Sequence, residues 1–484
     1  MGERGQDKTL GLQTHVLDRE RQTDLIPLDS IFELLTIAKR RVEDLHGQVL
    51  VSLTRPLPGE IDPIQMLAVG RRVSAMVNYW ALPVKGSCMV AVGKAAEIIA
   101  DGPLRFKQAA SSVRGMIRSA HVESNGASGL LFLGGFRFNP DPRGDGHWQE
   151  FRDGLLTVPR WLIATHSSGE RSLTINLALD EHADLDILRN ELVAQALALF
   201  DEREPPSHPL NASVTVEPLA DAWGEKVEQA LVAIKDGNLT KVTLARSLKV
   251  RSETIISPEV VLRSLVANYP ECRTFAFCRG GVSFVGASPE ELVSLNGPSV
   301  VSTCLAGSAP RGESEDADVE LSNWLLKSEK ERREHKVVVD WVSERMGALC
   351  DKLHWNDVPY VLRLGNVQHL ATSFVGTRAD GCDVLDFVEA LHPTPAVGGV
   401  PLEPALEMIE KLEDFDRGWY TGPVGWVDGN GNGEFAIAIR CALLRGKEAI
   451  LYAGDGIVAG SDPDTEDHES AMKFKPLLTA LGAL

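Results

Sequence analysis

Four ionisable side chains in the second half of the chain have the chemistry that proton transfer or metal binding requires: Lys241, Glu290, Glu334 and Glu469. A lysine that loses solvent beside other cations can release its proton and act as a base, and a buried carboxyl group can keep its proton and act as an acid. Carboxylates on neighbouring elements can supply oxygen ligands to Mg2+. Each residue also has an ordinary structural interpretation, which depends on the element that carries it.

Lys241 opens the segment KVTLARSLKV at 241–250, whose alternation predicts a strand. Val242 and Leu244 lie on one face of that strand, and Lys241 points away from them. An exposed lysine at the start of a strand is the ordinary interpretation, and a desolvated base in a pocket is the alternative. The segment alone leaves both open.

Glu290 lies in the segment GASPEELVSL at 286–295, which has two readings. In the first, Ser288 caps a helix whose capping box does not need Glu290. In the second, residues 291–295 form a strand that ends in an Asn-Gly turn, and Glu290 lies at the entry of that strand. Strand entries commonly carry catalytic side chains, and the segment supports both readings equally.

Glu334 belongs to the segment from Leu321 to Met346, which predicts one long helix rich in helix formers and charge pairs. A solvated pair with Lys330 is the usual explanation for such a glutamate. Glu334 nevertheless shares a stripe with Val338, four residues later, which should face the core. A carboxylate in that position must be paired, protonated or bound to a metal.

The C-terminal segment 453–484 predicts a glycine-containing turn followed by a helix, in which Glu466, Glu469 and Lys473 recur at intervals of three and four residues. An exposed pair of Glu469 with Lys473 is one interpretation. The other is a second carboxylate that joins Glu334 in binding Mg2+.

Arg440 follows the apolar run 435–439 and needs an anionic partner because it cannot lose its charge. That partner could be a structural carboxylate or a substrate. The loop LHPTPAVGGVP at 391–401 has small residues that allow backbone to approach a ligand. The residues DGNGNG at 428–433 match half of a calcium-binding loop, but the required glutamate at its twelfth position is missing, so a hairpin turn is predicted.

The composition is that of a globular chain of 484 residues, with 44% hydrophobic and 24% charged residues. A net charge of −19 argues against a nucleic-acid partner, and no apolar run approaches the length of a membrane span. The N-terminus lacks a secretory signal, which predicts a cytoplasmic protein. The seven scattered cysteines lack a CxxC pair, so we expect reduced core residues and no zinc site.

Short strand-like runs alternate with helical segments along the whole chain, which predicts an α+β (mixed α/β) protein. Residues 201–213, DEREPPSHPLNAS, are typical of a connection between packed regions. The predicted division is a polar tail over 1–26, an N-terminal α+β part over 27–205 and a catalytic region over 215–484.

Several segments, taken in order, resemble the chorismate-utilising enzymes and most closely the isochorismate synthases. They cover roughly residues 215–480 and are KVTLAR (241–246), GASPE (286–290), LAGSAPRG (305–312), SEKERREH (328–335), HLAT (369–372), LHPTPAVGGVP (391–401), DRGWYTGPVGW (416–426), AIR (438–440) and AGDGIVAGSDPDTEDHESAMK (453–473). The resemblance implies one compact body of large antiparallel sheets with flanking helices.

The resemblance also implies a reversible, Mg2+-dependent conversion of chorismate to isochorismate. Lys241 would activate the water that attacks C2, and Glu290 would protonate the departing C4 hydroxyl group. Glu334 and Glu469 would position the magnesium ion, with Glu466 in an outer role. The implied substrate-binding residues are Gly307, Ser308, His369, Ala396, Arg440, Gly456 and Lys473.

Relatives that use ammonia typically carry glutamine in place of Lys241, so the resemblance implies no glutamine amidotransferase subunit. Salicylate-forming relatives, which also eliminate pyruvate, usually differ in the 391–401 loop. A non-catalytic, chorismate-binding regulator is expected to lack a catalytic residue, and none is missing here. The long N-terminal part favours quinone over siderophore synthesis, and nothing demands more than a monomer. Asp455 departs from the small residue usual in AGxGIV; it could alter metal affinity or face solvent.

Overall fold

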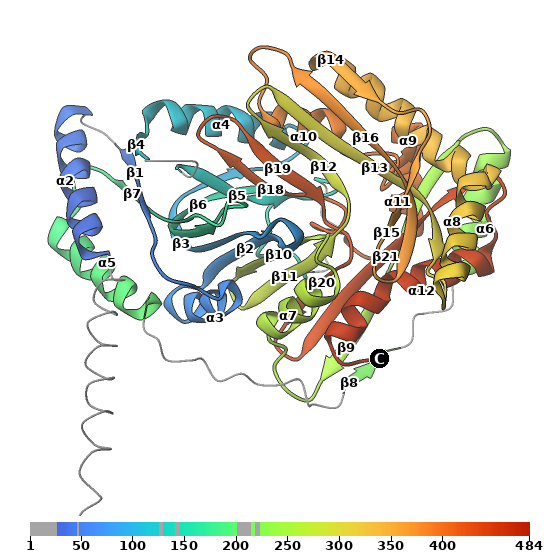
Figure 1. Ribbon diagram of the computed structural model, residues 1–484, viewed down its shortest axis with the longest axis horizontal. Coiled ribbons are helices and arrows are strands. Elements are labelled where there is room, and N and C mark those ends of the chain that lie inside the picture. The colour runs from blue at the N-terminus through green and yellow to red at the C-terminus, as the bar shows by residue number, and fades with distance from the viewer. Residues whose placement is uncertain (1–26, 46–47, 125–128, 141–145, 201–213, 218–222) are drawn as a thin grey trace, which may run out of the picture.

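The computed structural model describes residues 27–45, 48–124, 129–140, 146–200, 214–217 and 223–484. Backbone pairing joins the 21 strands of these ranges into one network, and helices cover its faces and ends (Figure 1). The expectation of an α+β chain with large antiparallel sheets and flanking helices is therefore confirmed. Among the helices in these ranges, none is long and apolar enough to cross a membrane.

The strands are β1 (Val49–Pro56), β2 (Met76–Leu82), β3 (Ser87–Ala100), β4 (His121–Glu123), β5 (Leu131–Phe136), β6 (Gly154–Thr165), β7 (Arg171–Leu179), β8 (Val214–Val216), β9 (Lys241–Ser252), β10 (Arg273–Arg279), β11 (Val282–Ser288), β12 (Glu291–Asn296), β13 (Ser299–Pro310), β14 (Cys350–Trp355), β15 (Tyr360–Arg363), β16 (Val367–Arg378), β17 (Gly399–Val400), β18 (Pro423–Asp428), β19 (Gly433–Ile437), β20 (Cys441–Arg445) and β21 (Glu448–Val458). The helices are α2 (Leu28–Leu45), α3 (Pro63–Val73), α4 (Arg105–Ser119), α5 (Leu185–Leu199), α6 (Trp223–Lys235), α7 (Pro258–Asn268), α8 (Glu315–Lys327), α9 (Glu329–Gly347), α10 (Val384–Leu391), α11 (Leu402–Leu412) and α12 (Pro463–Ala480), with a short 3-10 turn at Pro83–Lys85.

Strands from the two halves of the chain pair directly with each other. β2 lies antiparallel to β10, with Trp80 opposite Phe275. β5 lies antiparallel to β18, where Gly134 faces Gly425. The two halves therefore share one sheet network. The predicted connection at 201–213 and the polar tail at 1–26 lie outside the described residues.

An aromatic core fills the space between the sheets, because large rings from both halves of the chain meet there. Trp419 packs edge-on against Phe151 and Phe277, with ring centroids 5.0 and 5.5 Å apart. Its indole nitrogen donates to the backbone oxygen of Arg152 at 2.9 Å, which satisfies the polar atom of this buried side chain. This core fixes the DRGWYTG segment beside the candidate site.

The helix predicted over 321–346 is two helices, α8 and α9, so the prediction of one helix was wrong. Ser328 ends the first and begins the second. Its amide donates to the backbone oxygen of Trp324 at 2.8 Å, and its hydroxyl accepts from the amide of Glu331 at 3.4 Å. A serine favours such a cap because its side chain replaces a backbone partner, and the helix formers on both sides conceal the break in the sequence.

The hairpin predicted around 428–433 is confirmed, because β18 and β19 pair antiparallel with Val424 opposite Ala436. Asp428 stabilises the turn: its carboxylate accepts the backbone N–H groups of Asn430 and Asn432, each at 2.8 Å. The asparagines and glycines of this segment thus have a structural role.

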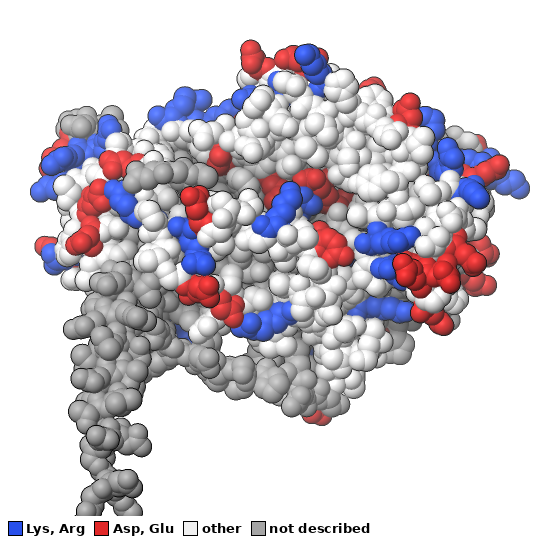
Figure 2. Space-filling view, in the orientation of Figure 1, with Lys and Arg blue, Asp and Glu red and all other residues white. Residues whose placement is uncertain are grey.

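Charged side chains of both signs are interspersed over the face that Figure 2 shows, and the basic ones form no continuous surface among the described residues there. All seven cysteines carry free thiols, four of them buried.

Candidate active site

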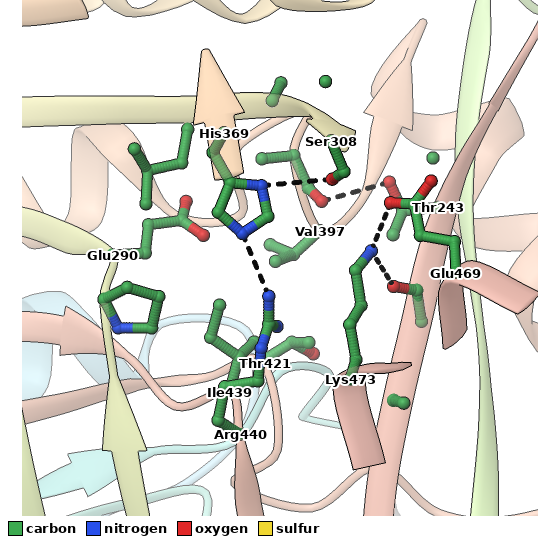
Figure 3. A pocket seen from close by; sticks show the side chains of 18 of the residues that line it. Thr243, Glu290, Ser308, His369, Val397, Thr421, Ile439, Arg440, Glu469 and Lys473 are labelled. Carbon is green, nitrogen blue, oxygen red and sulfur yellow. Dashed lines mark hydrogen bonds and ion pairs between the residues drawn. The ribbon is translucent and has the colours of Figure 1, made fainter. Parts of the chain in front are cut away.

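One pocket, with about 640 Å³ of empty space including its solvent-open mouth, is lined by all eleven residues that the sequence assigned to catalysis, metal binding or substrate binding. It lies between β9, β13, β16 and β21 on the sheet side and the N-terminal turns of α9 and α12. Its lining also includes Thr243, Pro289, Leu305, Ala306, Val397, Tyr420, Thr421, Ile439, Tyr452, Ala453 and Gly454. Figure 3 shows lining residues, ten of them labelled, that approach the cavity from different elements.

Lys241 starts β9 and is only 1% exposed, so the interpretation as a surface lysine is wrong. Its neighbours in the sheet are Val400 of β17 and Val458 of β21. The ammonium group donates to Glu334 Oε1 at 2.9 Å. Because a buried cation needs a counter-charge, this contact explains how the lysine is tolerated there.

Glu290 lies between β11 and β12, so the strand interpretation of its segment is confirmed and the helix interpretation is wrong. Its backbone is fixed on both sides: its amide donates to the Ser288 hydroxyl at 3.2 Å, and its carbonyl accepts from the amide of Ile437 at 3.1 Å. Burial raises the pKa of Glu290 to about 7, against the opposing effect of Lys241 and Arg440. This carboxyl group therefore holds a proton at neutral pH much more often than an ordinary glutamate.

A chain of hydrogen bonds connects Arg440, His369 and Ser308 along one wall of the cavity (Figure 3). Arg440 Nη2 lies 3.2 Å from His369 Nε2, and Ser308 Oγ lies 3.1 Å from His369 Nδ1. A guanidinium group can only donate, so Nε2 accepts and Nδ1 carries the proton. Burial and the Arg440 charge lower the pKa of His369 to about 3, which keeps the ring neutral.

Arg440 has a left-handed backbone, with φ of 50°, that is uncommon for a residue with a side chain. Its carbonyl accepts from the amide of Ala287, so the backbone is held in place. No carboxylate of the described residues forms a salt bridge with it, which makes the structural salt bridge the wrong alternative. The guanidinium group faces the cavity and is available to an anionic ligand.

Four glutamates gather where the first turns of α9 and α12 meet: Glu331, Glu334, Glu466 and Glu469. Burial and the neighbouring Glu334 raise the pKa of Glu331 to about 7. Burial and Glu469 also raise the pKa of Glu466, which accepts from Lys330 at 2.8 Å. Burial opposes ionisation of Glu469, but Lys473 and the Ser308 hydroxyl lower its pKa to about 2. The mutual repulsion of these oxygen ligands fits a divalent cation.

Asp455 is the group whose position the sequence left undecided, and it does not face solvent. It is 1% exposed on β21, beneath α12. Oxygen atoms of Asp455, Glu466 and Glu469 lie within 4.8 Å of one another. Burial raises the pKa of Asp455 to about 7, against the opposing charge of Lys473, with which it forms an ion pair at 2.7 Å.

The loop at 391–401 packs directly against β9. Thr243 of β9 donates its hydroxyl to the backbone oxygen of Ala396 at 3.2 Å. A side chain at Gly399 would lie 2.4 Å from the backbone oxygen of Lys241. The small residues of this loop thus let it pack directly against the strand that carries the lysine.

Glu413 and Arg417 form a buried ion pair that sequence reasoning missed. Arg417 donates to the backbone oxygens of Thr243 and Val397 at 2.8 and 2.9 Å, and Glu413 accepts from the amide of Ala245 at 2.8 Å. The pair therefore joins β9 to the loop at 391–401. An arginine inside the DRGWYTG block was the available signal.

The profile of the chorismate binding enzyme family matches residues 36–482, which is nearly the whole chain. The chain belongs to the chorismate binding enzymes. Isochorismate synthase MenF of Bacillus subtilis is 32% identical over 460 residues, covering 92% of this chain and 96% of the relative. The salicylate biosynthesis isochorismate synthase of Pseudomonas aeruginosa is 34% identical over 427 residues, covering 88% of each chain.

Solved structures agree with this assignment. MenF from Escherichia coli, a menaquinone-specific isochorismate synthase, superposes with a TM-score of 0.75 at 25% identity, covering 93% of this chain and all of that one. DhbC from Bacillus anthracis gives a TM-score of 0.68 at 29% identity, covering 86% and 99%. This chorismate binding enzyme therefore has the fold that the resemblance implied.

Proposed function

We propose that this chorismate binding enzyme is an isochorismate synthase that moves a hydroxyl group from C4 to C2 of the chorismate ring. The observation that carries the proposal is the presence, in one pocket, of a buried lysine and a buried glutamic acid whose pKa is about 7. Addition of water at one ring position and loss of hydroxide at another require a base and an acid together.

In the proposed reaction, Lys241 Nζ takes a proton from the water that attacks C2. Glu290 gives its proton to the C4 hydroxyl as that group leaves with the bond electrons, and the ring double bonds shift between the two positions. Glu334 Oε1 accepts a hydrogen bond from Lys241 Nζ at 2.9 Å, which orients the lysine side chain in the cavity. Burial favours the neutral form of Glu290, which is the form that can donate a proton in this reaction.

We assign a magnesium ion to Glu334 and Glu469, with Glu466 in an outer position. When bound, Mg2+ would neutralise the negative charge of the substrate's ring carboxylate and orient it. The clustered, mutually repelling carboxylates of α9 and α12 support this assignment. Arg440 supplies N–H groups for an anionic group of the substrate.

Product analysis tests the proposal directly. The purified protein is incubated with chorismate and Mg2+ without ammonia, and the products are separated by chromatography with a parallel EDTA control. Isochorismate that is formed reversibly and lost with EDTA is the expected result. Salicylate with pyruvate would instead identify a lyase-type member, and no turnover would identify a non-catalytic regulator.

Matched substitutions separate the catalytic residues from general effects. Lys241→Gln is expected to lower kcat roughly 10²- to 10⁴-fold, the usual contribution of a general base. Lys336→Gln, on an exposed lysine of α9, is the control and should leave kcat unchanged. Cytoplasmic location, a monomeric state and independence from an amidotransferase subunit remain predictions that fractionation and light scattering would test.

A further inference from the structure

Lys473 has no N–H group left for a substrate, because the protein itself occupies all three. Its ammonium nitrogen lies 2.9 Å from the backbone oxygen of Gly454, 2.7 Å from Asp455 Oδ1 and 2.8 Å from Glu469 Oε1. A lysine ammonium group has three donors and no acceptor, so these three contacts saturate it. Figure 3 shows two of them, to Glu469 and to the backbone oxygen below it.

Asp455 is the acceptor that makes this saturation possible. Gly454 and Glu469 would leave one N–H group free, and a small uncharged residue at 455 could not accept it. The Asp455 side chain is fully buried, with its second oxygen lacking a hydrogen-bond partner, so water does not weaken its attraction for Lys473. Its charge also offsets that of Lys473 next to the cavity.

Arg440 presents the opposite case in the same cavity. The structure gives its guanidinium group one side-chain contact, with His369 at 3.2 Å, although the group has five N–H donors. Burial lowers the pKa of Arg440, because the charge is poorly solvated and lacks a carboxylate partner among the described residues. An anionic substrate would supply Arg440 with the counter-charge that it lacks, whereas Lys473 is already paired with Asp455 and Glu469.

We propose that Asp455 is a positioning residue that holds Lys473 away from the substrate and thereby sets a low affinity for the anionic ligand, leaving Arg440 to receive it. This inference rests on the proposed function and specifies how its substrate is bound. It replaces the sequence-based expectation that Lys473 contacts the substrate directly. Asp455 does so by acting through Lys473, without touching the ligand itself.

Substitution of Asp455 tests the proposal through KM and kcat measured separately. In Asp455→Ala the freed N–H group and the unbalanced charge should strengthen binding, so KM for chorismate should fall about five-fold, as expected for one charge-assisted hydrogen bond partly offset by solvation. The substitution leaves the proposed base Lys241 and the proposed acid Glu290 in place, so kcat should change less than about two-fold. The gain should disappear in Asp455→Ala/Lys473→Met compared with Lys473→Met.

A KM that is unchanged or higher in Asp455→Ala, or a gain that persists without Lys473, would overturn the proposal. If Asp455→Ala does not fold, Asp455→Asn keeps the shape and the acceptor oxygen but removes the charge, and a smaller fall in KM is then expected. If the wild-type protein makes no isochorismate, the proposed function fails, yet the same variants can be compared by calorimetric titration with chorismate. In that comparison Kd for chorismate replaces KM. A Kd that falls in Asp455→Ala supports the inference, and a Kd that is unchanged or higher overturns it.

Discussion

At the scale of single residues, several ionisable groups in the cavity are buried. Most of these groups are stabilised by an ion pair or a hydrogen bond to a neighbouring side chain. Lys241 is paired with Glu334, and Arg440 contacts a neutral His369 that also contacts Ser308. Among the described residues that line the cavity, only Glu290 carries a carboxyl group that forms no ion pair. With a pKa raised to about 7, Glu290 changes its protonation state near neutral pH.

Titration of Glu290 should limit the reaction on the alkaline side. Its pKa is raised to about 7, so it is protonated below that pH and loses the proton as pH rises. The acid form donates to the leaving hydroxyl group, so kcat/KM should fall with an apparent pKa near 7. A profile of kcat/KM between about pH 5.5 and 9 measures this apparent pKa, which is then compared with the pKa of Glu290. A flat profile through pH 8, with Glu290→Gln retaining activity, would contradict the role.

Substitution of Gly456 tests whether the reaction requires the backbone to pass close to the Lys241–Glu334 pair. A methyl group there would lie 2.3 Å from Glu334 Oε1 and 2.8 Å from Lys241 Cε. Gly456→Ala should therefore displace the Lys241–Glu334 pair and lower kcat at least roughly 10²-fold, the scale for a misplaced catalytic base. The control is Gly347→Ala, because a side chain at Gly347 meets no atom within 4 Å. Near-wild-type kcat in Gly456→Ala would contradict the predicted displacement.

At the scale of elements, the site depends on where α9 and α12 begin. Both helices bring glutamates into the cavity within their first two turns, and both start at a capping side chain. Asp462 caps α12: its carboxylate accepts from the amide of Thr465 at 3.0 Å and from its hydroxyl at 2.9 Å. The cap fixes the turn that carries Glu466 and Glu469.

Removal of that cap should make the proposed metal ligands Glu466 and Glu469 less well positioned and should destabilise the helix. Asp462→Ala is expected to cost about 1 kcal/mol of unfolding free energy and to weaken Mn2+ binding, measured by electron paramagnetic resonance without chorismate. The control is Asp184→Ala, since Asp184 caps α5 through the amides of Asp186 and Ile187, far from the cavity in the sheet network. Asp184→Ala should cost a similar free energy of unfolding and leave the Mn2+ affinity unchanged. An equal loss of Mn2+ affinity in both variants would show that the α12 cap has no specific effect on metal binding.

At the scale of the whole molecule, we expect the two halves of the chain to unfold together, because strands of one half pair with strands of the other and their side chains pack in common cores. Trp80 of the N-terminal half donates to Glu434 at 3.0 Å, and Gly134 faces Gly425 across the β5–β18 pair. The catalytic strands therefore gain support from residues distant in sequence. This arrangement gives the N-terminal part a structural role in the site that the sequence alone did not reveal.

Substitution at Gly134 should destabilise the entire protein. A methyl group there would lie 1.8 Å from the backbone oxygen of Leu155, which cannot move without shifting β6. Gly134→Ala is expected to lower the free energy of unfolding by about 3 kcal/mol or more, the upper range for overpacking. Urea unfolding followed by tryptophan fluorescence and by circular dichroism should show one coincident transition at a lower midpoint. Two separate transitions would mean that the halves fold independently.

The sequence by itself determined the α+β class and the strand that begins at Lys241, predicted over 241–250 and observed over Lys241–Ser252. Its ordered motifs named the eleven residues that meet in one cavity. These features depend on local alternation, turn chemistry and residue type, which a linear sequence displays. The roles of those residues in catalysis and metal binding stay predictions.

Only the tertiary structure decided which alternative held at each residue. Lys241 and Asp455 are buried where β9 and β21 pair, with Asp455 beneath α12, and Arg440 contacts His369 and forms no salt bridge with a carboxylate of the described residues. The break at Ser328 also escaped the sequence pattern. Burial, pKa and the saturation of Lys473 arise from contacts between segments distant along the chain, so no local pattern could reveal them.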